Sequence, residues 1–309
     1  MSNNSNTPLV SILVASYNSA SFIADTINSC LDQAIENYEI IISDDNSTDN
    51  TWEIICQFNS SKIKKYRQEQ NIGEYANRDF LIEKAIGDFV IFIDGEDLIY
   101  AHALSVFTAY VKKYPLAGQF IAKEWDERII YPKIISPQEF AQMEFKGPGV
   151  TGLNFTRLFF KREILLLHRS FADNRSRLGD LYIQYLVGLK YPTVLIPEGF
   201  SWWRRRSGQA SEKILKDPLL YQAEVNKFIP GMLNDIEGIA AGEKEIMLRN
   251  YYGNTLRLLF YRFLKLHWAA VIGYFRHNPV PRKYLSSFFK RPVRNYMDQY
   301  NGEHPMKDN

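Results

Sequence analysis

Residues 9–15 read Leu-Val-Ser-Ile-Leu-Val-Ala, a nearly continuous run of apolar side chains. Such a run is typical of a strand buried on both faces, the usual situation of a strand inside a parallel sheet. The next residues, Ser16, Tyr17 and Asn18, are polar and mark the end of that strand. This segment therefore predicts an α/β fold whose sheet is covered by helices on both sides.

Strand and helix signals alternate from this segment to residue 94. The predicted strands are 9–15, 38–43, 64–68 and 89–93, and the predicted helices between them are 21–34, 52–58 and 75–85. Asp49 or Thr51 is expected to cap the second helix. This succession predicts a doubly wound, mainly parallel sheet, in which ligands bind beyond the carboxyl ends of the strands.

The remainder of the chain divides into a mixed stretch and a helical one. Residues 119–122 and 193–196 are strand-like, and residues 180–189 are expected to be helical. From residue 216 the pattern is helical, with breaks expected at Pro230, Gly253, Pro279, Pro281 and Pro292. We therefore expect an α/β domain over 1–215 and a helical region over 216–309.

Composition excludes several classes of protein. The 309 residues are 46% hydrophobic and 23% charged, unlike fibrous or disordered chains. Two cysteines, Cys30 and Cys56, are too few for a disulfide framework and lack metal-ligand spacing, which fits a reducing cytosol. The N-terminal residues do not resemble a signal peptide, and no apolar run approaches the ~20 residues of a transmembrane helix. We expect a soluble or peripheral protein in the cytoplasm.

Charge is distributed unevenly along the chain. The net charge of +2 combines +10 over residues 249–297, −2 over 298–309 and −6 over 1–248. An acidic body with a basic, aromatic C-terminal segment indicates that the two parts have different tasks.

The basic segment contains an amphipathic stretch over residues 256–266. In a helical projection, Arg257, Arg262 and Lys265 fall on one arc. The other arc holds Leu256, Leu259, Phe260, Phe263, Leu264 and Leu266. This pattern favours binding of residues 249–297 to an anionic membrane surface. The alternative is that the apolar arc packs on the α/β domain, and nucleic acid is disfavoured because no nucleic-acid motif accompanies the charge.

Polar clusters follow three of the predicted strands. They are Ser16–Asn18, Asp44–Asp49 and Asp94–Asp97. Carboxylates that are packed close together repel one another unless a cation joins them, so a divalent metal is implied. The alternative for Asp94–Asp97 is an ordinary Asp-Gly turn.

Four segments occur in order: Val10–Asn18, Ile42–Thr51, Asn71–Arg78 and Phe92–Asp97. Together they resemble the family 2 inverting glycosyltransferases of the GT-A fold. The resemblance covers about residues 8–110 strongly and 150–211 weakly. It implies a GT-A domain over 1–215, with a nucleotide-sugar half at about 8–110 and an acceptor half at about 111–215.

The resemblance assigns roles to the first three segments. Ala15, Tyr17 and Asn18 would line the nucleoside pocket. Asp44 would accept a hydrogen bond from the imide N–H of uracil or thymine, with Asp45 beside it. The alternative for Asp45–Asp49 is an Asx turn and a helix cap.

The loop and helix of the third segment resemble those whose arginine reaches the nucleotide or diphosphate. The residues concerned are Asn71, Gly73 and Arg78. The alternative for Arg78 is a structural salt bridge. In the fourth segment, Asp97 would bind Mg²⁺ or Mn²⁺, and Asp94 and Glu96 would lie at the donor, with Glu96 as a ribose contact or second metal ligand. The family usually has Asp where this chain has Glu96, which puts metal preference in doubt.

Residues 177–182 resemble the family's acidic motif at the start of a helix. Asp180 would then be the catalytic base, and the alternative is a plain N-cap. Many relatives carry Glu-Asp here, whereas this chain has Gly179-Asp180. Residues 202–211 follow the position where relatives often have a histidine, and Arg206 stands there instead.

Arg204 or Arg206 would neutralise the leaving diphosphate, since a guanidinium binds phosphate in a bidentate manner. The alternative for these arginines is a basic surface patch. Trp202 and Trp203 would stack on a sugar or belong to the core.

The resemblance implies a metal-dependent inverting glycosyltransferase that uses a nucleoside-diphosphate sugar, with UDP-sugars favoured. The acceptor would be a glycan or lipid-linked sugar, at the cytoplasmic face of the inner membrane, in polysaccharide assembly. One alternative is a non-catalytic relative that binds a nucleotide or glycan as a subunit of a synthesis complex. A nucleotidyltransferase is disfavoured because residues 15–20 contain no glycine for a phosphate loop.

Overall fold

The computed structural model describes residues 9–124, 126–127, 129–147, 149–152, 155–168, 177–204, 217–265 and 267–289. Predictions for Arg206, Leu266 and residues 290–297 lie outside these ranges. The packing of the chain divides it into two compact units. The first comprises Met1–Pro137, Thr151–Arg175 and Gly179–Arg204, and the second comprises Gln138–Val150, Ser176–Leu178 and Arg205–Asn309.

The first unit is built on a sheet that has eight strands in the described part of the chain. The strands are β1 (Val10–Ser16), β2 (Tyr38–Asp44), β3 (Ile63–Arg67), β4 (Phe89–Asp94), β6 (Gln119–Lys123), β7 (Lys133–Ile135), β8 (Leu158–Lys161) and β9 (Thr193–Pro197). Their order is β3-β2-β1-β4-β8-β6-β9-β7. β8 and β7 run antiparallel to their neighbours and the other pairs are parallel, so the predicted mainly parallel sheet is confirmed.

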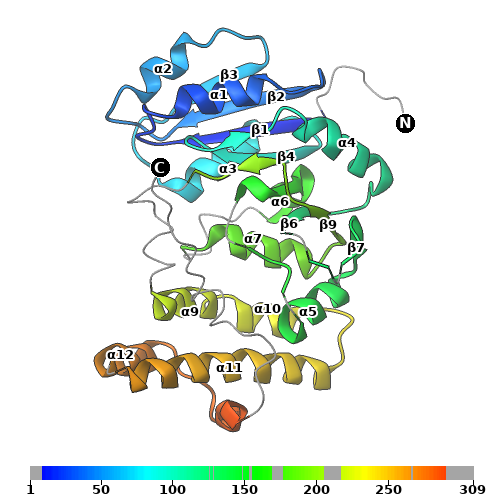
Figure 1. Ribbon diagram of the computed structural model, residues 1–309. Coiled ribbons are helices and arrows are strands. Elements are labelled where there is room, and N and C mark those ends of the chain that lie inside the picture. Colours follow the sequence, from blue (N-terminus) through cyan, green and yellow to red (C-terminus); the bar gives the residue numbers. More distant parts are fainter. Residues whose placement is uncertain are drawn as a thin grey trace. The chain divides into compact units, whose positions relative to one another are not determined.

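Helices cover both faces of this sheet, as the buried first strand predicts. They are α1 (Ile23–Leu31), α2 (Thr51–Gln57), α3 (Glu74–Lys84), α4 (Ala103–Lys113), α6 (Arg162–His168) and α7 (Gly179–Gly188), with a 3₁₀ turn η1 (Phe155–Arg157). Val10, Ile12 and Val14 pack in one core with α1 and α4. Helix α3 packs on β1 and β2 from the other face (Figure 1).

The sequence missed several short elements. These are β5 (Leu98–Ile99) and β10 (Ser201–Trp202), which form a separate two-stranded ribbon, together with β7, β8 and α6. The 11-residue helix α4 was missed as well, although it is not short. Strands of two to four residues are too short to show a period, which explains why β5, β7, β8 and β10 were missed.

The strand order places the ends of β1, β2 and β4 side by side. The chain leaves β1 toward β2 and β3 and returns on its other side as β4, which makes β1/β4 a topological switch point. In the register of the sheet, Ser16 is opposite Asp44 and Ala15 is opposite Asp94. All three predicted polar clusters therefore begin at one edge of the sheet.

The second unit is helical. It contains most of α5 (Pro137–Lys146), then α9 (Pro218–Asn226), α10 (Ile229–Asp235), α11 (Ala241–Leu264), α12 (Trp268–His277) and the 3₁₀ segment η2 (Arg282–Phe289). Leu219, Leu259, Val271 and Tyr274 form one of its buried clusters. Residues 138–150, which the sequence places in the acceptor half, group with these helices. None of the described helices has the length and apolar character needed to cross a bilayer.

Gly253 does not break the helix, and the prediction of a break was wrong. Helix α11 runs through it without interruption. A β-carbon at position 253 would lie 2.9 Å from the carbonyl oxygen of Ser287. The glycine therefore permits the close approach of η2 to α11, which is a packing role that local propensity does not reveal.

Gly253→Ala should lower thermal stability, although alanine is the better helix former by about 1 kcal/mol. The added methyl group would push against a backbone oxygen that cannot move freely. Gly273→Ala is the matched control, because a β-carbon there meets no atom within 4 Å in helix α12. Differential scanning fluorimetry of both variants checks this expectation, and equal stabilisation by the two substitutions would contradict it.

Candidate functional site

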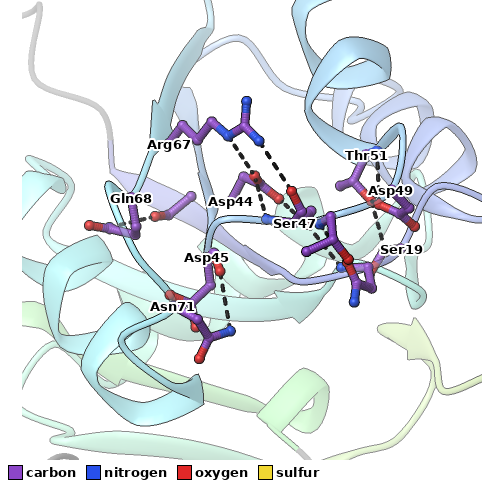
Figure 2. A network of polar contacts seen from close by, with 12 residues as sticks. Ser19, Asp44, Asp45, Ser47, Asp49, Thr51, Arg67, Gln68 and Asn71 are labelled. Carbon is purple, nitrogen blue, oxygen red and sulfur yellow. Dashed lines mark hydrogen bonds and ion pairs between the residues drawn. The ribbon is translucent and has the colours of Figure 1, made fainter.

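The turn after β2 is organised around a buried carboxylate, Asp44 (Figure 2). Its oxygens accept hydrogen bonds from the hydroxyl and the N–H of Ser47, and the guanidinium of Arg67 lies 3.6 Å away. Burial raises the pKa of Asp44, and the Ser47 bonds and Arg67 oppose that shift. Asp44 thus holds the turn in place, and its contact with a pyrimidine base stays a prediction.

The same turn is tied to the end of β1. The N–H of Asn18 donates to Ser47 Oγ at 2.9 Å, and Asn18 Oδ1 accepts from the N–H of Thr48 at 2.9 Å. Asn18 has φ 50°, a left-handed conformation that asparagine tolerates better than most residues. Asp49 Oδ1 accepts from the N–H of Thr51, the first residue of α2, at 3.0 Å, although the cap position itself is Asn50, which makes no side-chain cap bond. Ser19, which donates through its N–H to Thr51 Oγ1, adds to this network.

Asp45 fixes the loop that precedes α3. Its two carboxylate oxygens accept from the N–H groups of Ile72 and Gly73 at 2.8 and 2.9 Å. The amide of Asn71 donates to the Asp45 carbonyl at 3.2 Å. Gly73 has φ 90°, a conformation that favours glycine. The predicted Asn71 and Gly73 are therefore held next to the turn after β2.

Arg78 is a buried cation between two carboxylates. It pairs with Glu74 at 2.8 Å and with Asp94 at the end of β4. The face of the Phe155 ring lies 4.3 Å from the guanidinium carbon. Burial lowers the pKa of Arg78, but Asp94 and Glu74 outweigh this effect and raise it. The salt bridge considered from the sequence is present, and contact with a nucleotide stays a prediction.

The turn after β4 packs closely on the end of β1. The N–H of Gly95 donates to the carbonyl of Ala15 at 2.9 Å, and the N–H of Asp97 donates to the carbonyl of Asp94. A β-carbon at position 95 would lie 3.0 Å from the hydroxyl of Ser16. A side chain at position 95 would therefore have to displace the hydroxyl groups of Ser16 and Ser19 by a few tenths of an ångström, so glycine favours the close packing of this turn on β1.

Asp97 has one carboxylate oxygen in use and one without a partner. Oδ1 accepts from the N–H of Arg204 at 3.0 Å, whereas Oδ2 is buried and has no hydrogen-bond partner in the described part of the chain. Burial, and then the charge of Asp94, raise the pKa of Asp97 to about 8. A buried, unpartnered carboxylate oxygen among other acids fits a bound cation.

The residues at the predicted metal site are compatible with Mg²⁺ or Mn²⁺ only together with a ligand. Among the described residues, no group of three or more His, Cys, Asp or Glu side chains is arranged to hold a metal. Mg²⁺ is commonly bound through one or two carboxylates plus substrate phosphates. Asp97, with Glu96 next to it in the turn, fits that description.

Arg204 is fastened to the same turn. Its Nε donates to the carbonyl of Glu96 at 2.9 Å, and its guanidinium lies 3.6 Å from Asp25. It also lies over the ring of Trp202, 4.9 Å from the centroid. Trp202 is 43% exposed, and Trp203 is half-buried. Among the predicted nucleoside contacts, Tyr17 is 47% exposed and is thus available to a ligand.

Asp180 is brought to the Arg78–Asp94 pair although it is far from both in sequence. It is the second residue of α7, and its Oδ1 accepts from the N–H of Leu181 at 2.8 Å. Burial raises the pKa of Asp180 to about 7, with further contributions from Glu74 and Asp94, while Arg78 opposes the shift. A carboxyl group with a pKa near neutrality is suited to accept a proton.

Tyr75 was not predicted as a site residue. Its hydroxyl oxygen accepts the N–H of Gly179, the first residue of α7, at 2.9 Å. A β-carbon at position 179 would lie 2.3 Å from the Tyr75 ring. The space that a side chain at 179 would need is therefore filled by Tyr75. The sequence contained one indication of this role: Tyr75 lies one helical turn before Arg78, so both side chains are expected on the same side of the helix.

Comparison with known proteins identifies the family. A family model described as "Glycosyl transferase family 2" matches residues 11–167, just over half of the chain. The chain belongs to this family. WfgD of Escherichia coli, a UDP-Glc:alpha-D-GlcNAc-diphosphoundecaprenol beta-1,3-glucosyltransferase, is 31% identical over 132 residues, which are 42% of this chain and 52% of WfgD. For two other curated relatives the matched stretch covers 38% and 36% of the relative's own length.

Solved structures confirm the expected GT-A fold. Residues 1–349 of TarS from S. aureus, in complex with UDP-GlcNAc, give a TM-score of 0.62 at 18% identity, covering 79% of this chain and 71% of that one. The mannosyltransferase PcManGT from Pyrobaculum calidifontis, in complex with GDP-Man and Mn²⁺, gives 0.61 at 17% identity, covering 91% and 79%.

Asp180→Asn should raise thermal stability at pH 8 but not at pH 4. The carboxyl of Asp180 has a pKa of about 7 when folded and an ordinary value of 3.8. Between these values the unfolded chain gives up a proton that the folded chain keeps, so stability falls as pH rises through this window. Asparagine removes that loss.

Thermal melts of both proteins from pH 4 to 8 measure the effect. Asp88→Asn, at an exposed position of the same unit, is the matched control. A difference between Asp180→Asn and wild type that stays constant over the pH range would show that Asp180 titrates ordinarily.

Proposed function

We propose that the protein transfers a sugar, with inversion, from a nucleoside-diphosphate sugar to a hydroxyl of a glycan or lipid-linked acceptor. The observation that carries this proposal is the position of Asp180. Asp180, whose pKa burial raises to about 7, begins α7 where the charges of Arg78 and Asp94 act on it, and that pair lies at the switch point of a family 2 fold. Ligands of open α/β sheets bind at that edge.

In the proposed site the donor lies along the ends of β1, β2 and β4. Ala15, Tyr17 and Asn18 line the nucleoside pocket, and Asp44 and Asp45 shape its far side. The diphosphate lies toward the turn after β4. Asp97, with Glu96, would hold Mg²⁺ or Mn²⁺, and the ion would stabilise the charge of the leaving diphosphate.

The reaction is a single displacement. Asp180 takes the proton of the acceptor hydroxyl as its oxygen forms a bond to the anomeric carbon. The bond from that carbon to the diphosphate oxygen breaks on the opposite face, and its electron pair leaves with the nucleoside diphosphate. Arg204, held at the turn after β4, contributes positive charge near the leaving group.

Similarities support the chemical class of donor and acceptor. The TarS structure contains UDP-GlcNAc, and the name of WfgD specifies a UDP-glucose donor and a diphosphoundecaprenol-linked acceptor. PcManGT contains GDP-Man, so GDP is the competing donor class. A non-catalytic subunit is the second candidate. It is favoured by Glu96, which stands where the family usually has Asp.

Isothermal calorimetry with UDP, GDP, CDP and dTDP, each with and without Mn²⁺, tests the proposal. We expect UDP to bind, and more tightly with Mn²⁺. Asp97→Ala should weaken binding in Mn²⁺ and change little in EDTA. Asp180→Asn should bind UDP within a few-fold of wild type and lower transfer by roughly a hundredfold or more.

Three outcomes would count against the proposal. Wild type that binds no nucleotide would exclude the donor site. Binding without transfer, across UDP-sugars and GDP-sugars, would favour the non-catalytic subunit. Loss of nucleotide binding in Asp180→Asn would make Asp180 a structural residue rather than the base.

We further propose that the helical unit docks on an anionic membrane, where a lipid-linked acceptor would be found. Residues 249–289 contain no Asp or Glu. The proposed docking face consists of exposed apolar and basic side chains, namely Phe260, Phe263, Leu264, Lys265, Trp268, Ile272, Phe275, Arg276 and Arg282. Lys283 is exposed as well, but it pairs with Glu245 at 2.9 Å and is left out of this face. Each Lys or Arg near anionic lipid contributes about 1 kcal/mol.

Along helix α11, some residues of the predicted apolar arc are buried and others are exposed. Leu256 and Leu259 are buried, and Leu259 packs with Leu219, Val271 and Tyr274 of the helical unit, so it is not free to meet a membrane. Phe260, Phe263 and Leu264 are 48%, 43% and 61% exposed. A second copy of the same face would bring like charges together, which disfavours self-association through it.

Sedimentation of the full chain with vesicles tests this docking. Wild type should bind phosphatidylglycerol-containing vesicles, less so at high salt, and should not bind phosphatidylcholine alone. Phe263→Glu/Trp268→Glu should lose binding by roughly tenfold or more. Leu116→Glu, at a site 80% exposed in the first unit, is the control. Unchanged vesicle binding in the double variant would overturn the proposal. A wild-type dimer that becomes a monomer in the double variant would also overturn it, because the face would then be a subunit interface.

A further inference from the structure

One turn of helix α3 joins the end of β4 to the start of α7. Arg78 pairs with Asp94 at the end of β4. Tyr75, three residues earlier and thus on the same side of the helix, contacts Gly179 at the start of α7. The proposed donor-binding edge and the proposed base are therefore connected through one turn of a single helix.

The contact between Tyr75 and Gly179 is both polar and steric. The hydroxyl oxygen accepts one of the N–H groups that a helix leaves unpaired at its N-terminus. The ring occupies the space of a side chain at position 179, where a β-carbon would be 2.3 Å away. The first residue of α7 is thereby held in both direction and distance, and Asp180 is the next residue.

We infer that Tyr75 is the positioning residue for Asp180, a role that rests on the function proposed above. Its hydroxyl and ring set where the Asp180 carboxylate lies relative to Arg78 and Asp94. Tyr75 does not itself need to touch the reacting atoms. A catalytic base misplaced by about 1 Å can lose about a hundredfold in rate.

The body of α7 has a second attachment that does not involve Tyr75. Gln184 donates to the carbonyl of Gly152 at 2.6 Å and accepts from its N–H at 3.1 Å. Gln184 is itself fully buried. Removing the Tyr75 hydroxyl should therefore leave α7 folded and displace only its first turn, which makes Tyr75→Phe an informative variant.

Steady-state kinetics of the full chain test the inference. Tyr75→Phe should lower kcat roughly 10- to 100-fold while the KM for the donor and the affinity for UDP stay within a few-fold of wild type. Tyr66→Phe is the matched control, because Tyr66 lies on β3 with its ring against Phe80. An unchanged kcat in Tyr75→Phe would overturn the inference.

A double-mutant cycle tests the steric part. Gly179→Ala should lower kcat in the wild-type background, because the new methyl group pushes α7 away from the Tyr75 ring. In the Tyr75→Ala background that ring is absent, and the same change should have little further effect. Equal losses from Gly179→Ala in both backgrounds would overturn the role of the ring.

The two levels of proposal fail differently. Wild type that transfers sugar, with Tyr75→Phe equally active, overturns only the positioning role. Wild type that transfers no sugar overturns the proposed function, and the positioning role with it. A drop in UDP affinity parallel to the drop in kcat would make Tyr75 a donor-site residue instead.

Discussion

A buried guanidinium between carboxylates holds the active edge of the sheet together. Arg78 is almost fully enclosed and pairs with Glu74 and Asp94, and Asp180 lies close enough for its charge to act on them. The side chain of Arg78 is 3% exposed, whereas the side chains of Glu74 and Asp94 are 49% and 38% exposed, so loss of either carboxylate would leave a buried cation with less compensation. Arg78 thus compensates part of the charge of the acids that end β4 and begin α7.

One arginine does not neutralise the whole cluster, and burial raises the pKa of two of its acids. The pKa values of Asp97 and Asp180 are raised to about 8 and about 7. A buried carboxyl group whose charge is not fully compensated lowers stability. The same raised pKa is useful for binding a cation or accepting a proton. In the proposed mechanism, a bound cation would balance the negative charge of the Asp97 carboxylate. Asp180 accepts a proton from the acceptor hydroxyl.

The sequence predicted the sheet well where burial dictates composition. Strands β1, β2 and β4 each have a mostly apolar run, so their positions were predicted to within about one residue. The edge of the sheet that collects the polar clusters followed from strand order. The Tyr75–Gly179 contact could not be predicted, because it joins residues distant in sequence and depends on atomic distances. Gly253 was misjudged for the same reason, since its role is set by Ser287 across a helix contact.

The fit between Tyr75 and Gly179 restricts the order in which the two positions can change. A larger residue at 179 is obstructed as long as the ring is present, because its β-carbon would fall inside the ring's contact distance. A smaller residue at position 75 leaves only a cavity. A cavity is tolerated better than the steric overlap that a side chain at 179 makes with the Tyr75 ring. A route from Gly-Asp to Glu-Asp at 179–180 therefore passes first through loss of the aromatic ring. An engineer who grafts the acidic pair into this chain should make the two substitutions in that order or together.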